Sequence, residues 1–217
     1  GFEVERDGTV IDTVAADSTT YGDTGLSPGT EYSYRVRAVD AGGASPSSDG
    51  DSALAEDGIG DPGPAGGLIF YDDKDDGTDD HSFRYLEAAP ASTEWNGIEW
   101  GGYGTDINGD NSTVAPELDS IGDGQANTTA IVTALGDNGG TDYAAKLADD
   151  LQHNGYTDWF LPSKNELDLM YQNLYQQGLG GFGAHYYSSS SEYNADHAWE
   201  QYFSTGSQNF YYKYGTD

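Results

Sequence analysis

The 217-residue sequence contains no cysteine, and only 8 Lys and Arg residues stand against 38 Asp and Glu residues. The absence of cysteine excludes disulfides, thiolate zinc sites and cysteine nucleophiles. The net charge of −30 repels phosphate backbones and anionic lipids, so we expect neither a nucleic-acid partner nor an anionic membrane surface as a partner. No apolar run approaches the roughly 20 residues of a membrane-spanning helix, so we expect no membrane insertion.

Aromatic residues, by contrast, are abundant, with 17 Tyr, 7 Phe and 4 Trp. Disordered acidic segments are poor in aromatics, so this composition predicts a folded chain whose core is built on rings. Among the acidic residues Asp outnumbers Glu. Asp favours turns and, in clusters, binds hard cations, although solubility in a salty medium also explains the overall charge.

Residues 1–55 alternate as strands do, with a hairpin turn predicted at Asp7-Gly8. The segment 26–39 reads LSPGTEYSYRVRAV, and its alternation places Tyr32, Tyr34 and Val36 on one strand face. This string resembles the fibronectin type III domain from its third strand onward, with Tyr32 as the tyrosine corner. The resemblance implies a partial all-β fibronectin type III sandwich over residues 1–55, and a chain that already begins in a strand is expected to be part of a longer protein.

The Gly- and Pro-rich segment 56–66 (EDGIGDPGPAG) predicts a linker. Beyond it, periodicity predicts short strands over 68–71, 186–187, 199–203 and 210–212, and helices over 128–135, 143–152 and 163–173. Ser163 and Glu166 have the spacing of a capping box at the start of the last helix. Helices mixed with short antiparallel strands and long loops predict an α+β architecture.

Five strings in this second part occur together in a known family. They are GLIFY (67–71), RYLEAAP (84–90), IGDGQANT (121–128), GYTDWFLPSKNEL (155–167) and YSSS (187–190). Their order and spacing resemble the Lcl C-terminal domain family, a C-type-lectin-like module of bacterial surface adhesins. The resemblance implies a ligand-binding domain over 67–217, with two helices on small antiparallel sheets, located extracellularly at the bacterial cell surface.

Two acidic segments are candidate calcium sites, because carboxylate and amide oxygens at alternate positions can surround one hard cation. Several ions are expected, and the metal-ligand candidates are Asp106, Asn108, Asp110, Ser112, Glu117, Asp123, Asp72, Asp73, Asp75, Asp76 and Asp79. Pro116 prevents the helix that would follow in an EF-hand, so a calcium loop without flanking helices is predicted. A polar surface turn at 106–112 and a solvated hairpin tip at 72–81 remain the alternatives.

In C-type-lectin-like domains, ligands bind through the long loops and the neighbouring strands, commonly with a bridging calcium ion. The resemblance therefore implies that the ligand-binding residues include Gln125, Asn127, Tyr186, Ser189, Ser190, Glu192, Gln208, Asn209 and Tyr211. The sugar-binding triplets Glu-Pro-Asn and Gln-Pro-Asp do not occur, which leaves both a glycan and a peptide C-terminus as ligands. The chain's own end at Asp217, bound in a neighbouring molecule, is one such candidate, whereas Trp159 and Trp199 are expected in the core.

No Gly-x-Ser-x-Gly motif and no phosphate-binding loop occurs, so we expect no enzymatic activity. The sequence favours calcium-dependent binding of a peptide or glycan by a large secreted bacterial adhesin, in cell-surface or biofilm attachment. Two alternatives remain: a structural spacer stiffened by calcium without a ligand, and a glycan-acting hydrolase, since paired carboxylates are abundant.

Overall fold

The computed structural model describes residues 1–23, 26, 30–54, 58–73, 82–107 and 118–215, and it divides the chain into two compact units, Gly1–Asp57 and Gly58–Asp217. The protein has an α+β architecture, in which N-terminal antiparallel sheets precede a helical region and a C-terminal three-stranded antiparallel sheet. In the described ranges, no helix is long and apolar enough to cross a membrane.

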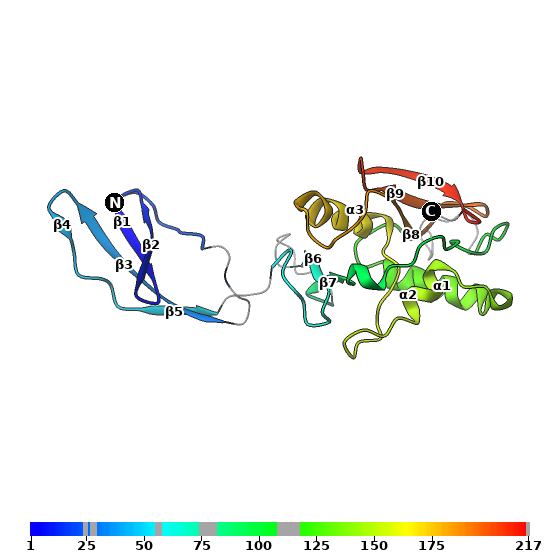
Figure 1. Cartoon of the computed structure of the whole chain (residues 1–217), viewed down its shortest axis with the longest axis horizontal. Helices are drawn as coiled ribbons and strands as arrows, with labels where there is room; N and C mark the ends of the chain where they lie inside the picture. Colours follow the sequence, from blue (N-terminus) through cyan, green and yellow to red (C-terminus); the bar gives the residue numbers. More distant parts are fainter. Residues whose placement is uncertain (24–25, 27–29, 55–57, 74–81, 108–117, 216–217) are drawn as a thin grey trace. The chain divides into compact units, whose positions relative to one another are not determined.

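The first unit is an antiparallel sheet (Figure 1). Its strands are β1 (Phe2–Arg6), β2 (Thr9–Val14), β3 (Glu31–Asp40), β4 (Gly43–Ala44) and β5 (Asp51–Leu54). The predicted turn between β1 and β2 is confirmed, because Asp7 and Gly8 have φ angles of 50° and 78°, as a tight hairpin requires. The long strand β3 pairs with β1, β4 and β5.

The first unit has little core of its own. Among its described residues Val4 is the one buried apolar side chain, and Val36 remains 46% exposed. Tyr32 and Tyr34 are half-buried, so the predicted apolar face of β3 ends before Val36. The strands that the structure describes in this unit pair in a single sheet, which corresponds to one layer of the predicted partial sandwich.

The second unit begins with a segment that composition predicts to be a linker. In the structure, residues 58–66 turn back along β6 (Leu68–Asp72) and bond to it. The amide of Gly60 donates to the carbonyl of Ile69 (2.8 Å), and the amide of Ile69 donates to the carbonyl of Asp61 (2.9 Å). β6 pairs in turn with β7 (Tyr85–Ala88). The Gly and Pro residues therefore make turns that extend this small sheet.

Three α-helices and a second sheet complete this unit. The elements are α1 (Gly124–Leu135), α2 (Ala144–Asp149), α3 (Lys164–Asn173), β8 (Tyr186–Glu192), β9 (His197–Tyr202) and β10 (Ser207–Tyr212), with the short 3-10 helices η1 (Ala91–Thr93), η2 (Asn138–Gly140) and η3 (Tyr175–Gln177). The C-terminal sheet has the order β10-β9-β8, and α3 packs against β8 and β9 while α1 packs against β8 (Figure 1). Against the prediction, α1 begins earlier and α2 is shorter.

The capping box at α3 is confirmed. The Ser163 hydroxyl accepts from the Glu166 amide (3.3 Å), and the Glu166 carboxylate accepts from the Ser163 amide (2.7 Å). Glu166 is fully buried and also accepts from the amide of Gly122 (2.7 Å), just before α1. One carboxylate thus joins the starts of two helices, and its burial raises its pKa against the opposing hydrogen bonds.

Candidate functional site

A band of aromatic side chains covers one side of the C-terminal sheet. We call it the aromatic surface; it consists of Tyr103, Tyr193, His197, Trp199, Phe210, Tyr212 and Tyr214. Cross-strand pairing explains its centre, because Phe210 lies opposite Trp199 and Tyr212 lies opposite His197 in the β9–β10 register. Directly paired residues share a sheet face, so these four rings meet.

Loop residues extend this band at both ends. Tyr193 stacks on Phe210 with ring centroids 4.3 Å apart and nearly parallel planes, while Tyr214 stacks on Tyr212 at 5.1 Å. Tyr103 meets the edge of Tyr214 at 4.8 Å. The exposed fractions of Tyr103, Phe210 and Tyr214 are 52%, 47% and 50%. The rings therefore hold one another in place while keeping about half of their surface in water.

A lysine borders the aromatic surface. The Lys164 ammonium, from the first residue of α3, lies 3.7 Å from the centroid of the Trp199 ring and 3.5 Å from a carboxylate oxygen of Asp119. Trp199 was expected in the core, but it is half-buried, between this ammonium and the ring of Phe210. The cation and the ring quadrupole attract each other, which fixes the Trp199 ring.

Four of the predicted ligand-binding residues lie at or near the surface of this sheet. Asn209 and Tyr211 project from β10 on the face opposite Phe210 and are exposed. Gln208 is half-buried, and its amide donates to the carbonyl of Lys164 (2.8 Å). Tyr186 stacks on Tyr202 at 4.5 Å and is 40% exposed. Gln125 is exposed on α1, a helix that is distant from β10 in the sequence.

The other four predicted ligand-binding residues are buried, so in this structure they do not face a ligand. Asn127, Ser189 and Ser190 have no exposed surface, and Glu192 is 2% exposed. Their hydrogen bonds join loops to β8: the Ser189 hydroxyl donates to the carbonyl of Trp199 (2.8 Å), and the Asn127 amide donates to the carbonyl of Leu118 (2.6 Å) and the Ser190 hydroxyl (3.3 Å). Ser189 and Ser190 are therefore internal: one hydroxyl donates to a carbonyl of β9, and the other accepts from a side chain of α1.

Glu192 forms a buried ion pair with Lys213, which follows β10. Neither side chain is exposed. The Lys213 ammonium also donates to the carbonyl of Thr105 (2.8 Å) and lies 4.7 Å from the Trp100 ring, while the amide of Ile107 donates to the Glu192 carboxylate (3.3 Å). Burial raises the pKa of Glu192 and lowers that of Lys213, and their mutual attraction opposes both shifts.

The predicted metal ligands are only partly described. Asn108, Asp110, Ser112, Glu117, Asp75, Asp76 and Asp79 lie outside the described residues. Of the other four, Asp106 is half-buried just before the undescribed residues 108–117. Asp72 pairs with Arg84 (3.4 Å), Asp73 accepts from the Tyr71 hydroxyl (3.0 Å), and Asp123 is the N-cap residue of α1 and accepts from the amide of Ser120 (2.7 Å). Within the described ranges, no three His, Asp or Glu side chains gather in a way that could hold a metal ion.

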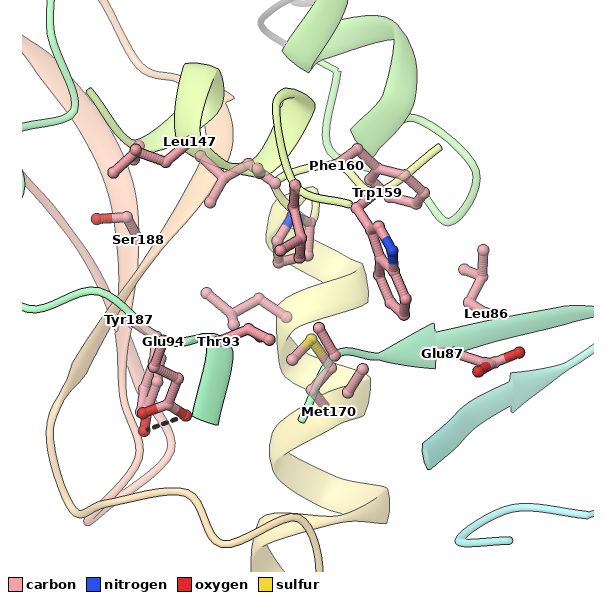
Figure 2. Close-up of a pocket in the computed structure, with 18 of the residues that line it drawn as sticks. Leu86, Glu87, Thr93, Glu94, Leu147, Trp159, Phe160, Met170, Tyr187 and Ser188 are labelled. Carbon is pink, nitrogen blue, oxygen red and sulfur yellow. Dashed lines mark hydrogen bonds between the residues drawn. The ribbon is translucent and has the colours of Figure 1, made fainter. Parts of the chain in front are cut away.

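A second feature, which the sequence did not reveal, is a cavity of about 750 Å³ within the second unit. Its walls come mainly from β7, η1, α2, α3, the first residues of β8 and the loops at 94–98, 156–162 and 182–185 (Figure 2). Trp159, expected in the core, lies half-buried in its wall. At one side the Tyr187 hydroxyl donates to the Glu94 carboxylate (3.4 Å), and burial raises the pKa of Tyr187 to about 12.

The aromatic surface and the cavity both present apolar side chains to possible ligands. No model of a protein family, no curated protein and no solved structure matches this chain.

Proposed function

We propose that the second unit is a ligand-binding domain of the C-type-lectin-like class, which a larger secreted bacterial adhesin uses for attachment at the cell surface. The observation that carries this proposal is the aromatic surface on β9 and β10, whose rings are held by one another yet remain about half exposed. A contiguous exposed apolar band of this kind is uncommon on a protein without a binding partner.

The rings fix what kind of ligand would bind. Their flat faces suit the apolar face of a sugar ring or the side chains of an extended peptide, while the Tyr hydroxyls supply hydrogen bonds. With a net charge of −30, the protein repels polyanionic ligands, so a neutral or basic glycan or peptide is favoured. A peptide C-terminus, including this chain's own tail in a neighbouring molecule, is one ligand of the peptide class. Binding alone is proposed, without catalysis.

Calcium is the second part of the proposal, and it rests on the acidic loop that starts at Asp106. The neighbouring Glu192 already has a cation, the Lys213 ammonium, so calcium would be held by Asp106 and the loop oxygens at 108–117 rather than by Glu192. Bound there, the ion would neutralise the loop carboxylates and bring positive charge close to Tyr103, which precedes Asp106 by three residues.

The test combines a thermal and a binding measurement. Calorimetric melting in calcium and in excess chelator should show a higher midpoint with calcium, with about 2.7 kcal/mol of added stability at 100 times the dissociation constant. Retention on immobilised glycans and peptides should require calcium and should be lost in Phe210→Ala. Calcium-dependent melting without retention on any array would instead support a spacer, and melting that ignores calcium would remove the ion from the proposal.

A further inference from the structure

The cavity of the second unit is independent of the aromatic surface. None of the seven residues of the aromatic surface lines it. Helix α2 supplies one wall, since Ala144, Leu147 and Ala148 lie on one of its faces and line the cavity, and Leu151 continues this wall just after the helix. Phe160 and Met170 contribute from the loop before α3 and from α3 itself, and Leu86 from β7 (Figure 2).

Its size and lining are those of a small-molecule site. Ligand cavities in proteins measure roughly 300–1,000 Å³ and are lined mainly by apolar and aromatic side chains with a few polar groups. Here the volume is about 750 Å³, and the polar groups stand among rings such as Trp159, Phe182 and Tyr187. At the rim, Trp95 and Tyr156 are 46% and 39% exposed, although burial would favour both.

One polar atom in the wall lacks a bonding partner. The indole nitrogen of Trp159 is buried, yet within the described part of the chain it donates no hydrogen bond. A buried N–H without an acceptor costs about 1–3 kcal/mol, so Trp side chains in such places usually bond something. That nitrogen has almost no surface open to water, so it faces protein atoms and not the open space of the cavity.

The charges around the cavity select among apolar molecules. Three acidic residues, Glu87, Glu94 and Asp158, belong to the lining, and none of its residues is Lys or Arg. Glu87 is engaged by the amides of Ala65 (3.1 Å) and Gly67 (3.0 Å). Glu94 has the Tyr187 hydroxyl as its partner, and burial raises its pKa. Among the described lining residues His185 is the one basic side chain, and it lies close enough to Glu94 to interact with its charge. An anionic head group would therefore meet three carboxylates against a single imidazole, whereas a neutral or positively charged one would not be repelled.

We propose that this cavity binds an uncharged or cationic apolar molecule of drug size, with its rings or alkyl chain between α2 and α3 and any positive charge toward Glu94. The site is separate from the glycan or peptide surface and does not depend on calcium.

A matched pair of fluorescent probes tests this inference on the full chain. N-phenyl-1-naphthylamine is uncharged, and 8-anilino-1-naphthalenesulfonate has the same rings with an added sulfonate. We expect the neutral probe to bind at one site, with its emission excited by energy transfer from Trp, and the sulfonate to bind at least tenfold more weakly. Equal binding of both probes in 0.5 M salt would contradict the charge selection, because salt screens the general repulsion but leaves the local contacts.

Two variants locate the probe. Ala148→Phe adds a ring to the cavity wall on the Leu147 face of α2, and Ala144→Trp adds one at a half-buried position of the same face. Each variant that keeps the melting midpoint within a few degrees should lose at least tenfold in affinity for the neutral probe. Phe210→Ala, on the aromatic surface, should bind it as the parent chain does. Loss in Phe210→Ala with retention in both filled variants would overturn the proposal while leaving the function of the aromatic surface intact.

Discussion

The Lys213 ammonium and the Glu192 carboxylate form an ion pair that has no exposed side-chain surface. Glu192 ends β8, and Lys213 follows β10, so the pair links the two outer strands of the C-terminal sheet beyond the end of β9. Through the Thr105 carbonyl and the Ile107 amide it also holds the start of the acidic loop. Burying two charges is costly, and removing only one of them leaves the other uncompensated.

We therefore expect Lys213→Met to destabilise the second unit by about 3–5 kcal/mol in chemical denaturation. The double variant Lys213→Met/Glu192→Leu should lose less, because no buried charge is left alone. Lys146→Met is the matched control: Lys146 pairs with Asp150, which is 59% exposed, and loss of an exposed pair costs up to about 1 kcal/mol. If the double variant were as unstable as the sum of its single changes, the two residues would be energetically independent.

Glu166 should make stability depend on pH. Its pKa is raised in the folded state, so on folding it takes up protons at pH values between its ordinary value of 4.5 and the raised value. The stabilisation from proton uptake is fully present below pH 4.5 and is lost as pH rises through the raised pKa. Glu166→Gln, which cannot take up this proton, should lack that dependence.

The measurement is denaturant unfolding of both proteins at a series of pH values from 4 to 8. The free-energy difference between the parent chain and Glu166→Gln should shrink as pH rises above 4.5. Asp168→Asn on the same helix serves as a control for general charge removal. A difference that stays constant with pH would show that Glu166 has the same pKa in both states.

Phe210 and Tyr211 occupy opposite faces of β10, and their substitution should separate two surfaces. If the aromatic surface contacts the ligand, Phe210→Ala should weaken retention tenfold or more, whereas Tyr211→Ala should weaken it less. Both side chains are 47% exposed, so each change should cost about 1 kcal/mol or less of stability. Surface plasmon resonance with the array ligand that is retained most strongly measures the affinity of both variants. A larger loss in Tyr211→Ala would place the ligand on the other face.

The calcium loop can be tested at Asp110, which lies outside the described residues. Asp110→Ala should abolish the rise in melting midpoint with calcium, because the fifth position of such a loop supplies a ligand oxygen. Asp142→Ala removes the same charge from the exposed loop before α2 and should keep that rise. Equal calcium responses in the two variants would assign any bound ion to another part of the chain, such as residues 72–81.

Local patterns in the sequence predicted the local structure well. Ser163 and Glu166 predicted the start of α3 because a capping box involves residues only three apart. Asp7-Gly8 predicted a hairpin because a tight turn also depends on neighbouring residues alone. The roles of Ser189 and Ser190 could not be read in this way, because their partners are carbonyls and side chains brought in from distant segments. Exposed and buried serines look alike in sequence.

The apolar sites show the same limit. The aromatic surface depends on the register that sets Phe210 opposite Trp199 and on the loop that brings Tyr193 over Phe210. The cavity lies between several elements, from β7 to β8. The spacing of residues within any one of these elements therefore does not predict it. The sequence predicted Trp159 as an ordinary core residue. That its indole nitrogen has no hydrogen-bond partner among the described residues is visible only in three dimensions.

Among the strands that the structure describes, β10 (SQNFYY) lies at the edge of its sheet and contains no charged residue. An edge strand with apolar side chains invites pairing with another molecule. The rest of the chain supplies the protection, since a net charge of −30 keeps copies apart at a distance. That repulsion reaches about 30 Å at 0.01 M ionic strength but only about 8 Å at 0.15 M. We therefore expect the tendency of copies to associate to depend on salinity: repulsion keeps the molecules dispersed in dilute buffer, and high salt allows their sheet edges to approach one another.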